Sequence, residues 1–402
     1  MQLDSKTLKH QKKVCYLSTY PPKQCGIAVF TKDLVDNLDD TGEFAQATVM
    51  AVKKWDATER YGSELTWQIA KDREEDYFQA AIQINASDVD VVNIQHEFGI
   101  FGGEFGNYIL SFLENVKKPV VTSLHTVQPD FEPKALRVLK EIVFYSAAVV
   151  VTGRTAANIL TGYGFPSEKI KVIQHGCPNV PFIASDTVKP SLNLAGRTVL
   201  CTFGLLSPGK GVEYAIQALP SIVERHPDAL YLIIGVTHPE VKISNDETYR
   251  KQLFKLVKEL ELQNNVQFQN RFLTKSELIR YLQSTDIYLT PYVGENQISS
   301  GTLIYALGTG RAIVSTPYLH AQEVLDNGRG MLCEFKNPAS IAHSVNRILA
   351  DKQLKQSIER KAYEFSRRFT WFEIAKKYSK LFKQVIDKEK GELSVELPAH
   401  NA

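Results

Sequence analysis

The tetrapeptide Ser299 to Thr302 stands where a polar loop meets an apolar segment. The β-branched and aromatic run 286–291 precedes the loop 294–297, and the apolar run 303–307 follows, so the predicted order is strand, loop and helix start. Unpaired N–H groups in the first turn of a helix, together with the helix dipole, bind anions such as phosphates. Serine and threonine are also ordinary N-caps. The residues alone therefore leave two alternatives, a phosphate-binding loop and a helix that is merely well capped.

A second polar group, Gln95-His96-Glu97, follows a predicted strand and precedes a glycine-rich turn. A histidine and a carboxylate at this place could bind the hydroxyls of an acceptor or move a proton, or they could only order the loop. His175 lies at the end of the first half of the chain, where it could make either a hinge hydrogen bond or a ligand contact.

Composition excludes several classes of protein. With 44% hydrophobic and 23% charged residues the chain is typical of a soluble globular protein, and its net charge of +2 with no dense basic tract does not suggest nucleic acid as a partner. It has no apolar run of about 18 residues, so no transmembrane segment is expected. The polar residues 1–13 lack the apolar core of a secretion signal, which predicts a cytoplasmic protein.

Metal and nucleophile chemistry find little support in the spacing of residues. The five cysteines are odd in number and far apart, so we expect reduced, mostly structural thiols. No set of histidines, cysteines and carboxylates has the spacing of a metal site, and the signatures of serine hydrolases and Walker-type nucleotide triphosphatases are absent.

Short apolar runs alternate with helical-period segments through both halves of the chain, which predicts parallel sheets covered by helices. A chain of 402 residues exceeds the size of one growing core, so two doubly wound α/β domains facing a cleft are expected. The predicted parts are a first domain at 1–180, a proline-rich linker at 181–197, a second domain at 198–368, an amphipathic helix at 369–390 and a tail at 391–402. We expect this helix to pack across the two domains, although it could also contact a membrane surface or a partner.

Five segments in this order resemble the family-four glycosyltransferases, also called glycosyl transferases group 1, which have the two-domain GT-B fold. The segments are Pro21–Gly26, Leu124–Thr126, Gly204–Gly211, Pro291–Gly310 and Phe369–Trp371. The resemblance covers nearly the whole chain, and the loop 95–104 resembles a bacterial subgroup. It implies a nucleotide-sugar donor held mainly by the second domain, an acceptor held mainly by the first, and transfer with retention of configuration, without a bound metal or other cofactor.

The resemblance also implies roles for particular residues. Lys210 would neutralise the donor diphosphate, with Gly204 in the same phosphate loop, and His125 would hydrogen-bond the transferred sugar near the reaction centre. Gly26 would let the backbone of the first domain approach the phosphates. The remaining implied contacts are the helix-start amides of Ser300, Gly301, Thr302 and Leu303 for the phosphates, and His96 and Glu97 for the acceptor.

The chain departs from the family at its paired glutamates, whose positions hold Gln297 and Tyr305. Both side chains can still hydrogen-bond sugar or ribose hydroxyls, so Gln297 is expected at the catalytic centre and Tyr305 at the donor. The arginine usually found two places after Gly204 is also missing, and Arg271 or Arg311 could supply that charge.

These features predict a metal-independent, retaining hexosyltransferase that uses GDP-mannose or a UDP-hexose to build a surface glycan, a capsular polysaccharide or a glycoside. Two alternatives stay open. One is a phosphorylase of the same fold that uses free phosphate, because the carboxylate for the ribose is missing. The other is a catalytically silent sugar-binding protein.

Overall fold

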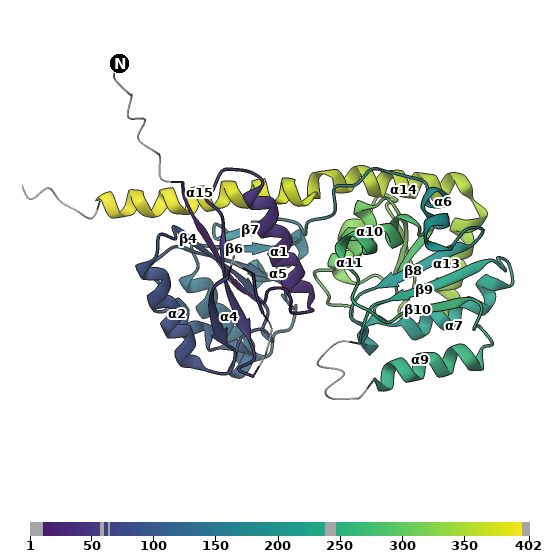
Figure 1. Cartoon of the computed structure of the whole chain (residues 1–402), viewed down its shortest axis with the longest axis horizontal. Helices are drawn as coiled ribbons and strands as arrows, with labels where there is room; N and C mark the ends of the chain where they lie inside the picture. The colour runs from purple at the N-terminus through teal and green to yellow at the C-terminus, as the bar shows by residue number, and fades with distance from the viewer. Residues whose placement is uncertain (1–10, 57–59, 63–64, 238–246, 396–402) are drawn as a thin grey trace, which may run out of the picture. The chain divides into compact units, whose positions relative to one another are not determined.

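The chain forms two compact units, each built on its own parallel sheet (Figure 1). The computed structural model describes residues 11–56, 60–62, 65–237 and 247–395. Of these described residues, those within 1–152, 156–174 and 372–402 form the first unit, and those within 153–155 and 175–371 form the second. The polar N-terminal segment up to residue 10 and the last part of the predicted tail, 396–402, lie outside the described residues.

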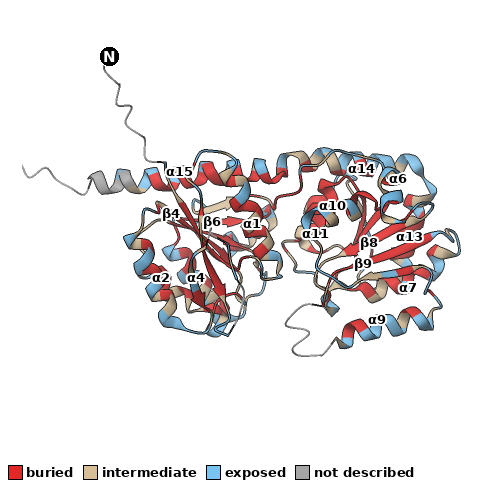
Figure 2. Cartoon of the chain, in the orientation of Figure 1, coloured by how far each residue is buried: buried red, intermediate tan, exposed pale blue. Residues whose placement is uncertain are grey.

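The first unit contains a seven-stranded sheet in the order β3-β2-β1-β4-β5-β6-β7, and all neighbouring strands are parallel. Its central strands are buried on both faces, which is why they read as continuous apolar runs (Figure 2). The strands are β1 (Val14–Ser18), β2 (Thr48–Lys53), β3 (Leu65–Ala70), β4 (Val91–His96), β5 (Val120–Leu124), β6 (Ala148–Val151) and β7 (Ile170–Val172).

Edge strand β3 was not predicted from the sequence. Its burial alternates along Leu65–Ala70, so it lacks the apolar run that reveals the inner strands. The helices here are α1 (Gly26–Asp39), α2 (Glu74–Ala86), the 3-10 turn η1 (Glu104–Gly106), α3 (Ile109–Leu113), α4 (Pro133–Tyr145), α5 (Arg154–Gly162) and α15 (Trp371–Val395).

The second unit contains a six-stranded parallel sheet in the order β10-β9-β8-β11-β12-β13. Its core gathers buried residues from the strands and from the helices that cover them, such as Ile216, Leu289 and Val345. The strands are β8 (Thr198–Phe203), β9 (Ala229–Ile234), β10 (Val266–Gln269), β11 (Ile287–Thr290), β12 (Ala312–Ser315) and the two-residue β13 (Met331–Leu332).

The helices and 3-10 turns of the second unit alternate with these strands, as the periodicity predicted. They are α6 (Ser185–Val188), η2 (Lys189–Leu192), η3 (Pro208–Lys210), α7 (Val212–Val223), α9 (Thr248–Glu259), α10 (Lys275–Gln283), α11 (Gly301–Gly308), α12 (Leu319–Leu325), α13 (Pro338–Ala350), α14 (Lys352–Ser366) and η4 (Arg367–Phe369). No helix in the described part of the chain combines the length and the apolar character needed to span a bilayer.

Two expectations about connecting segments are corrected. Residues 181–197, predicted to lack secondary structure, contain α6 and η2. They pack on the second sheet because Ser185 Oγ donates to Asp286 Oδ1 at 2.6 Å and Lys189 Nζ lies 2.7 Å from Asp286 Oδ2. At the other end of the chain α15 continues to Val395, so the tail expected from residue 391 is helical over its first part.

The suggestion that Arg311 supplies phosphate-binding charge is also corrected. Arg311 precedes β12 and therefore lies at the amino edge of a parallel sheet, opposite the edge where strand-end loops emerge. Its side chain is 1% exposed and donates to the carbonyls of Thr309, Gln283, Thr285 and Ile183. The guanidinium therefore closes the end of the sheet, and it is not available to a ligand.

Replacing this arginine tests that structural role. Arg311→Met should lower the free energy of unfolding by roughly 3–5 kcal/mol, because four carbonyls lose a charged donor in a buried place. Arg271→Met is the control, since the exposed pair of Arg271 with Glu277 should contribute under about 1 kcal/mol. Urea unfolding measures both variants. Equal losses in the two would contradict the assignment.

Candidate functional site

The loops that could hold a ligand emerge on either side of the point where strand order reverses in the second sheet. β8 and β11 are neighbours, and the chain continues from β8 toward β9 on one side and from β11 toward β12 on the other. Ligands of such sheets bind outside the carboxyl ends of the strands at this switch point. The loops are 204–211 after β8 and 291–300 after β11, and the amide of Val293 joins them by donating to Gly209 O at 3.2 Å.

Lys210, from the first of these loops, is held against a tyrosine of the second. Its ammonium lies 4.0 Å from the centroid of the Tyr292 ring, and the Tyr292 hydroxyl lies 2.7 Å from Thr302 Oγ1. Burial opposes ionisation of this phenol, but Lys210 and the hydroxyls of Thr302 and Ser300 hold the pKa of Tyr292 below its ordinary value. Lysine, tyrosine and helix start thus form one connected group.

The start of α11 offers fewer donors than the sequence suggested. Ser300 is the N-cap, and its Oγ accepts from the amide of Leu303 at 3.4 Å. The amide of Ser300 itself donates to His320 Nδ1 at 2.9 Å. The Ser300 and Leu303 amides were predicted to bind phosphates, and this prediction is corrected because both already donate hydrogen bonds within the protein. Over the described residues the amides of Gly301 and Thr302 have no partner, so these two groups remain for an anion.

Two histidines support this helix start, and sequence reasoning identified neither role. His320, which no sequence pattern singled out, accepts from Ser300 through Nδ1, so its neutral ring carries the proton on Nε2. His175 donates from Nδ1 to Gly176 O at 2.7 Å and faces Gly301 with Nε2. A Cβ at residue 301 would lie 2.6 Å from that nitrogen, so only glycine fits there.

Glycines also shape the loop after β8. Gly204 and Gly235 have φ of +135° and +133°, and a Cβ on Gly235 would lie 2.0 Å from Gly204 O. A Cβ on Gly204 would lie 3.5 Å from Thr302 Cγ2. The absence of side chains therefore lets the ends of β8 and β9 pack together beside the start of α11.

The residues at the altered glutamate positions are both engaged within the second unit. Gln297 lies in the loop before α11, where its Nε2 donates to Ser299 O at 2.9 Å. Tyr305 is 6% exposed, packs near His175, and accepts from Trp371 Nε1 at 3.3 Å. Both residues order their surroundings here, and their roles toward a donor stay predictions.

Arg271 is not brought to this group. It follows edge strand β10, is exposed, and pairs with Glu277 at the start of α10 at 2.8 Å. The suggestion that Arg271 supplies the missing positive charge therefore has no support from the placement of this residue.

In the first unit the loops after β4 and β5 are joined at their strand ends. The amide of His125 donates to His96 O at 3.0 Å, and Thr126 Oγ1 donates to the carboxylate of Glu97. The His125 ring lies edge-on to Phe30, with Nε2 2.8 Å from Gln95 Oε1. The loops that carry His125 and Glu97 are thus held together, and the roles of both residues toward a substrate stay predictions. Gly26 begins α1, and a Cβ there would meet no atom within 4 Å, so its own surroundings do not require glycine.

His96 does not join this group, which corrects its expected role in acceptor binding. It is the last residue of β4 and is fully buried, stacked on Phe101 and edge-on to Phe98. Neither ring nitrogen has a hydrogen-bond partner among the described residues, and burial lowers the pKa of His96 to about 3. The imidazole acts as an apolar ring.

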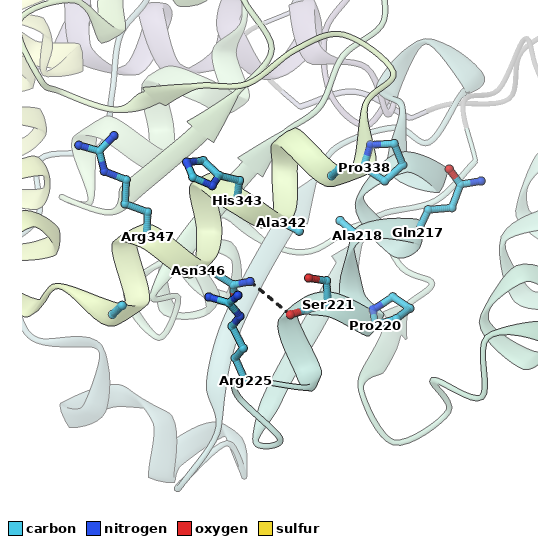
Figure 3. A pocket seen from close by; sticks show the side chains of 12 residues that line it. Gln217, Ala218, Pro220, Ser221, Arg225, Pro338, Ala342, His343, Asn346 and Arg347 are labelled. Carbon is cyan, nitrogen blue, oxygen red and sulfur yellow. Dashed lines mark hydrogen bonds between the residues drawn. The ribbon is translucent and has the colours of Figure 1, made fainter.

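A hollow of about 590 Å³ lies elsewhere in the second unit, between α7 and α13 (Figure 3). It is lined by residues of the two helices, such as Ser221, His343, Asn346 and Arg347, and by Arg225, which follows α7. Asn346 Nδ2 donates to Ser221 O at 3.2 Å. This hollow shares no residue with the loops at the switch point. Within the described ranges no three histidine, cysteine or carboxylate side chains gather as a metal site would require.

The two buried histidines lead to opposite predictions. His320→Leu should lower the free energy of unfolding by about 1–3 kcal/mol at pH 7, because the Ser300 amide loses its acceptor. His96→Leu should stay within about 1 kcal/mol of the parent, because no hydrogen bond is lost. Urea unfolding at pH 7 compares them, and an equal cost for His96→Leu would mean that its ring has a partner.

Their pH dependence follows from the same burial. Burial lowers the pKa of His320 to about 4 and that of His96 to about 3, whereas an unfolded histidine titrates near about 6.5. The unfolded chain therefore binds protons first, so stability is full above pH about 6.5 and falls as the pH drops toward these values. Each variant should flatten this fall, by at most about 1.4 kcal/mol per pH unit.

Comparison with known proteins agrees with this architecture. The family glycosyl transferases group 1 matches residues 185–365. An uncharacterized glycosyltransferase of Methanocaldococcus jannaschii is 25% identical over 315 residues, which cover 75% of this chain and 76% of that protein. The phosphatidyl-myo-inositol mannosyltransferase of Mycolicibacterium smegmatis is 27% identical over 212 residues, covering 52% of this chain and 51% of that protein.

A solved structure shows the same fold. Anabaena HepE in complex with UDP and glucose has a TM-score of 0.74 and 17% identity, over 93% of this chain and 100% of that one. At this identity the likeness speaks for the fold alone. Residues 185–365 thus match the glycosyl transferases group 1 family, and the two parallel-sheet units have the GT-B fold.

Proposed function

We propose that this glycosyltransferase moves a hexose of the mannose or glucose type from a GDP- or UDP-linked donor to a glycan or glycoside acceptor. In this proposal the anomeric configuration is retained and no metal takes part. The observation that carries it is the connected group at the switch point of the second sheet. There Lys210 packs on the Tyr292 ring, and the Tyr292 hydroxyl hydrogen-bonds Thr302 at the start of α11. The group presents one positive charge and the amides of Gly301 and Thr302.

These groups suit a departing diphosphate. When the bond between sugar and phosphate breaks, negative charge grows on the phosphate oxygens, and donors that are already oriented stabilise it without rearranging. The lysine is a compact charge on a flexible stem, and the two amides point along the dipole of α11. The acceptor hydroxyl would attack the same face, and the leaving phosphate would take its proton.

The similar proteins support a nucleotide-sugar donor without deciding its base. HepE was solved with UDP and glucose, and the Mycolicibacterium relative is named a mannosyltransferase. We propose that His125 hydrogen-bonds the transferred sugar and that Glu97, held by Thr126, takes an acceptor hydroxyl.

One observation keeps a phosphorylase as the second candidate. The position that would hold a ribose-binding carboxylate carries Tyr305, which is buried and bonded to Trp371. Lys210 and the two amides of α11 could hold inorganic phosphate without any ribose contact.

Thermal shift with UDP, GDP, ADP and inorganic phosphate separates these candidates. The proposal expects one of UDP and GDP at about 100 times its Kd to stabilise the protein by about 2.7 kcal/mol, and Lys210→Met to abolish that shift. In a transfer assay Lys210→Met should lower kcat by roughly 10²–10³-fold. Lys255→Met, which removes an exposed lysine of α9, is the matched control and should change neither reading.

Other results would contradict the proposal. A response to phosphate alone would favour the phosphorylase, and a response to none of the four would favour a silent sugar-binding protein. Full turnover by Lys210→Met would show that the switch point of the second sheet is not where the leaving group binds.

A further inference from the structure

A hydrogen-bonded network of buried polar side chains crosses the first unit from α15 to His125. Asn93 and Gln95 alternate with apolar residues on β4, so both point to the same face of the sheet. Their direct neighbours on β5 are Val121 and Ser123. Ser123 Oγ in turn lies 2.9 Å from the hydroxyl of Tyr378 on α15.

This network of side chains is closed to water over nearly its whole length. Asn93 and Gln95 are 0% exposed, Ser123 is 3% exposed and Tyr378 is 1% exposed, whereas His125 is half-buried at the strand end. Buried amides must find partners within the protein, so the orientation of each one constrains the next.

The donor-to-acceptor direction of the hydrogen bonds in this network is set by a backbone carbonyl, which can only accept. The carbonyl of Val121 accepts from Asn93 Nδ2 at 2.8 Å, which turns Asn93 Oδ1 toward Gln95. That oxygen accepts from Gln95 Nε2 at 2.5 Å, which turns Gln95 Oε1 toward His125. This last oxygen can only accept, so the nitrogen 2.8 Å away from it, Nε2 of His125, must carry a hydrogen.

Ser123 also constrains the orientation of the side-chain amides of Asn93 and Gln95. Its Oγ accepts from Asn93 Nδ2 and from Gln95 Nε2, each at 3.4 Å. Both lone pairs of the hydroxyl are then used, so its hydrogen points to Tyr378. Helix α15 therefore covers a polar network on this face of the sheet.

We propose that Gln95 is a positioning residue that holds His125 in the tautomer protonated on Nε2. In the neutral ring Nδ1 then carries the lone pair, so any group that bonds this nitrogen must donate to it. For the reaction this means that His125 acts as an acceptor at Nδ1 and is not free to rotate. This functional part rests on the proposed role of His125 at the transferred sugar.

The tautomer can be measured without any activity. Long-range ¹H–¹⁵N spectra of the full chain with labelled histidine, assigned by the loss of signals in His125→Asn, distinguish protonation on Nε2 from protonation on Nδ1. The proposal expects Nε2–H in the parent protein at neutral pH. Protonation on Nδ1 in the parent would overturn it, whether or not any variant folds.

A variant pair tests whether Gln95 is the cause. Gln95→Met keeps the length of the side chain and removes the acceptor, so the Nε2–H signal should give way to a mixture of tautomers, and kcat should fall roughly tenfold or more with little change in the donor KM. Thr122→Val is the matched control, because Thr122 is equally buried, points to the other face of β5 and bonds Ser146 instead. It should keep both the tautomer and kcat.

Failure of this inference and failure of the proposed function can be told apart. An unchanged tautomer and unchanged kcat in Gln95→Met would overturn the inference while leaving the transferase intact. A parent that shows the Nε2–H tautomer but transfers no sugar would support the hydrogen-bond chain and refute the proposed function.

Discussion

The constraint on which the rest depends is parallel strand pairing. Every paired strand in both sheets runs parallel to its neighbours, so every loop that follows a strand leaves its sheet at the same edge. In each sheet the order also reverses once, between β1 and β4 and between β8 and β11. Chemistry-bearing loops that are far apart in sequence, such as 204–211 and 291–300, are brought together for this reason alone.

Close packing then decides how much of each edge is available to a ligand. In the second unit His320 and the cap of Ser300 occupy two amides of α11, and Gly301 has no room for a side chain beside His175. The groups that remain for a ligand are the amides of Gly301 and Thr302, the hydrogen-bonded hydroxyls beside them and Lys210 packed on Tyr292. A site of this kind suits a compact anion such as a phosphate group.

The inner strands and the loops that follow them could be predicted from the sequence, because apolar runs reveal buried strands and polar loops follow them. Strands β3 and β13 could not, since one is half exposed and the other has two residues. The loops around Lys210 and Gly301 were placed at the correct sheet edge for the same reason, by their position after β8 and β11.

The choice among polar side chains could not be predicted, because it depends on which way each one turns. His96 ends a strand and is buried, whereas the next residue, Glu97, reaches Thr126. Arg311 stands before a strand whereas Lys210 stands after one, and this places Arg311 at the opposite edge of the sheet. Gln95 was noticed as part of a polar motif, but its partners lie on another strand.

The central claim is that the amides of Gly301 and Thr302 bind the diphosphate of the donor. Titration of protein labelled with ¹⁵N at glycine and threonine with UDP or GDP tests it most directly, each amide being assigned from backbone triple-resonance spectra of the parent protein. The account predicts that these two amide signals shift with the nucleotide that binds, and that the signal of Gly308 at the other end of α11 stays in place. Saturation of the protein with a nucleotide while both amide signals remain unmoved would contradict it.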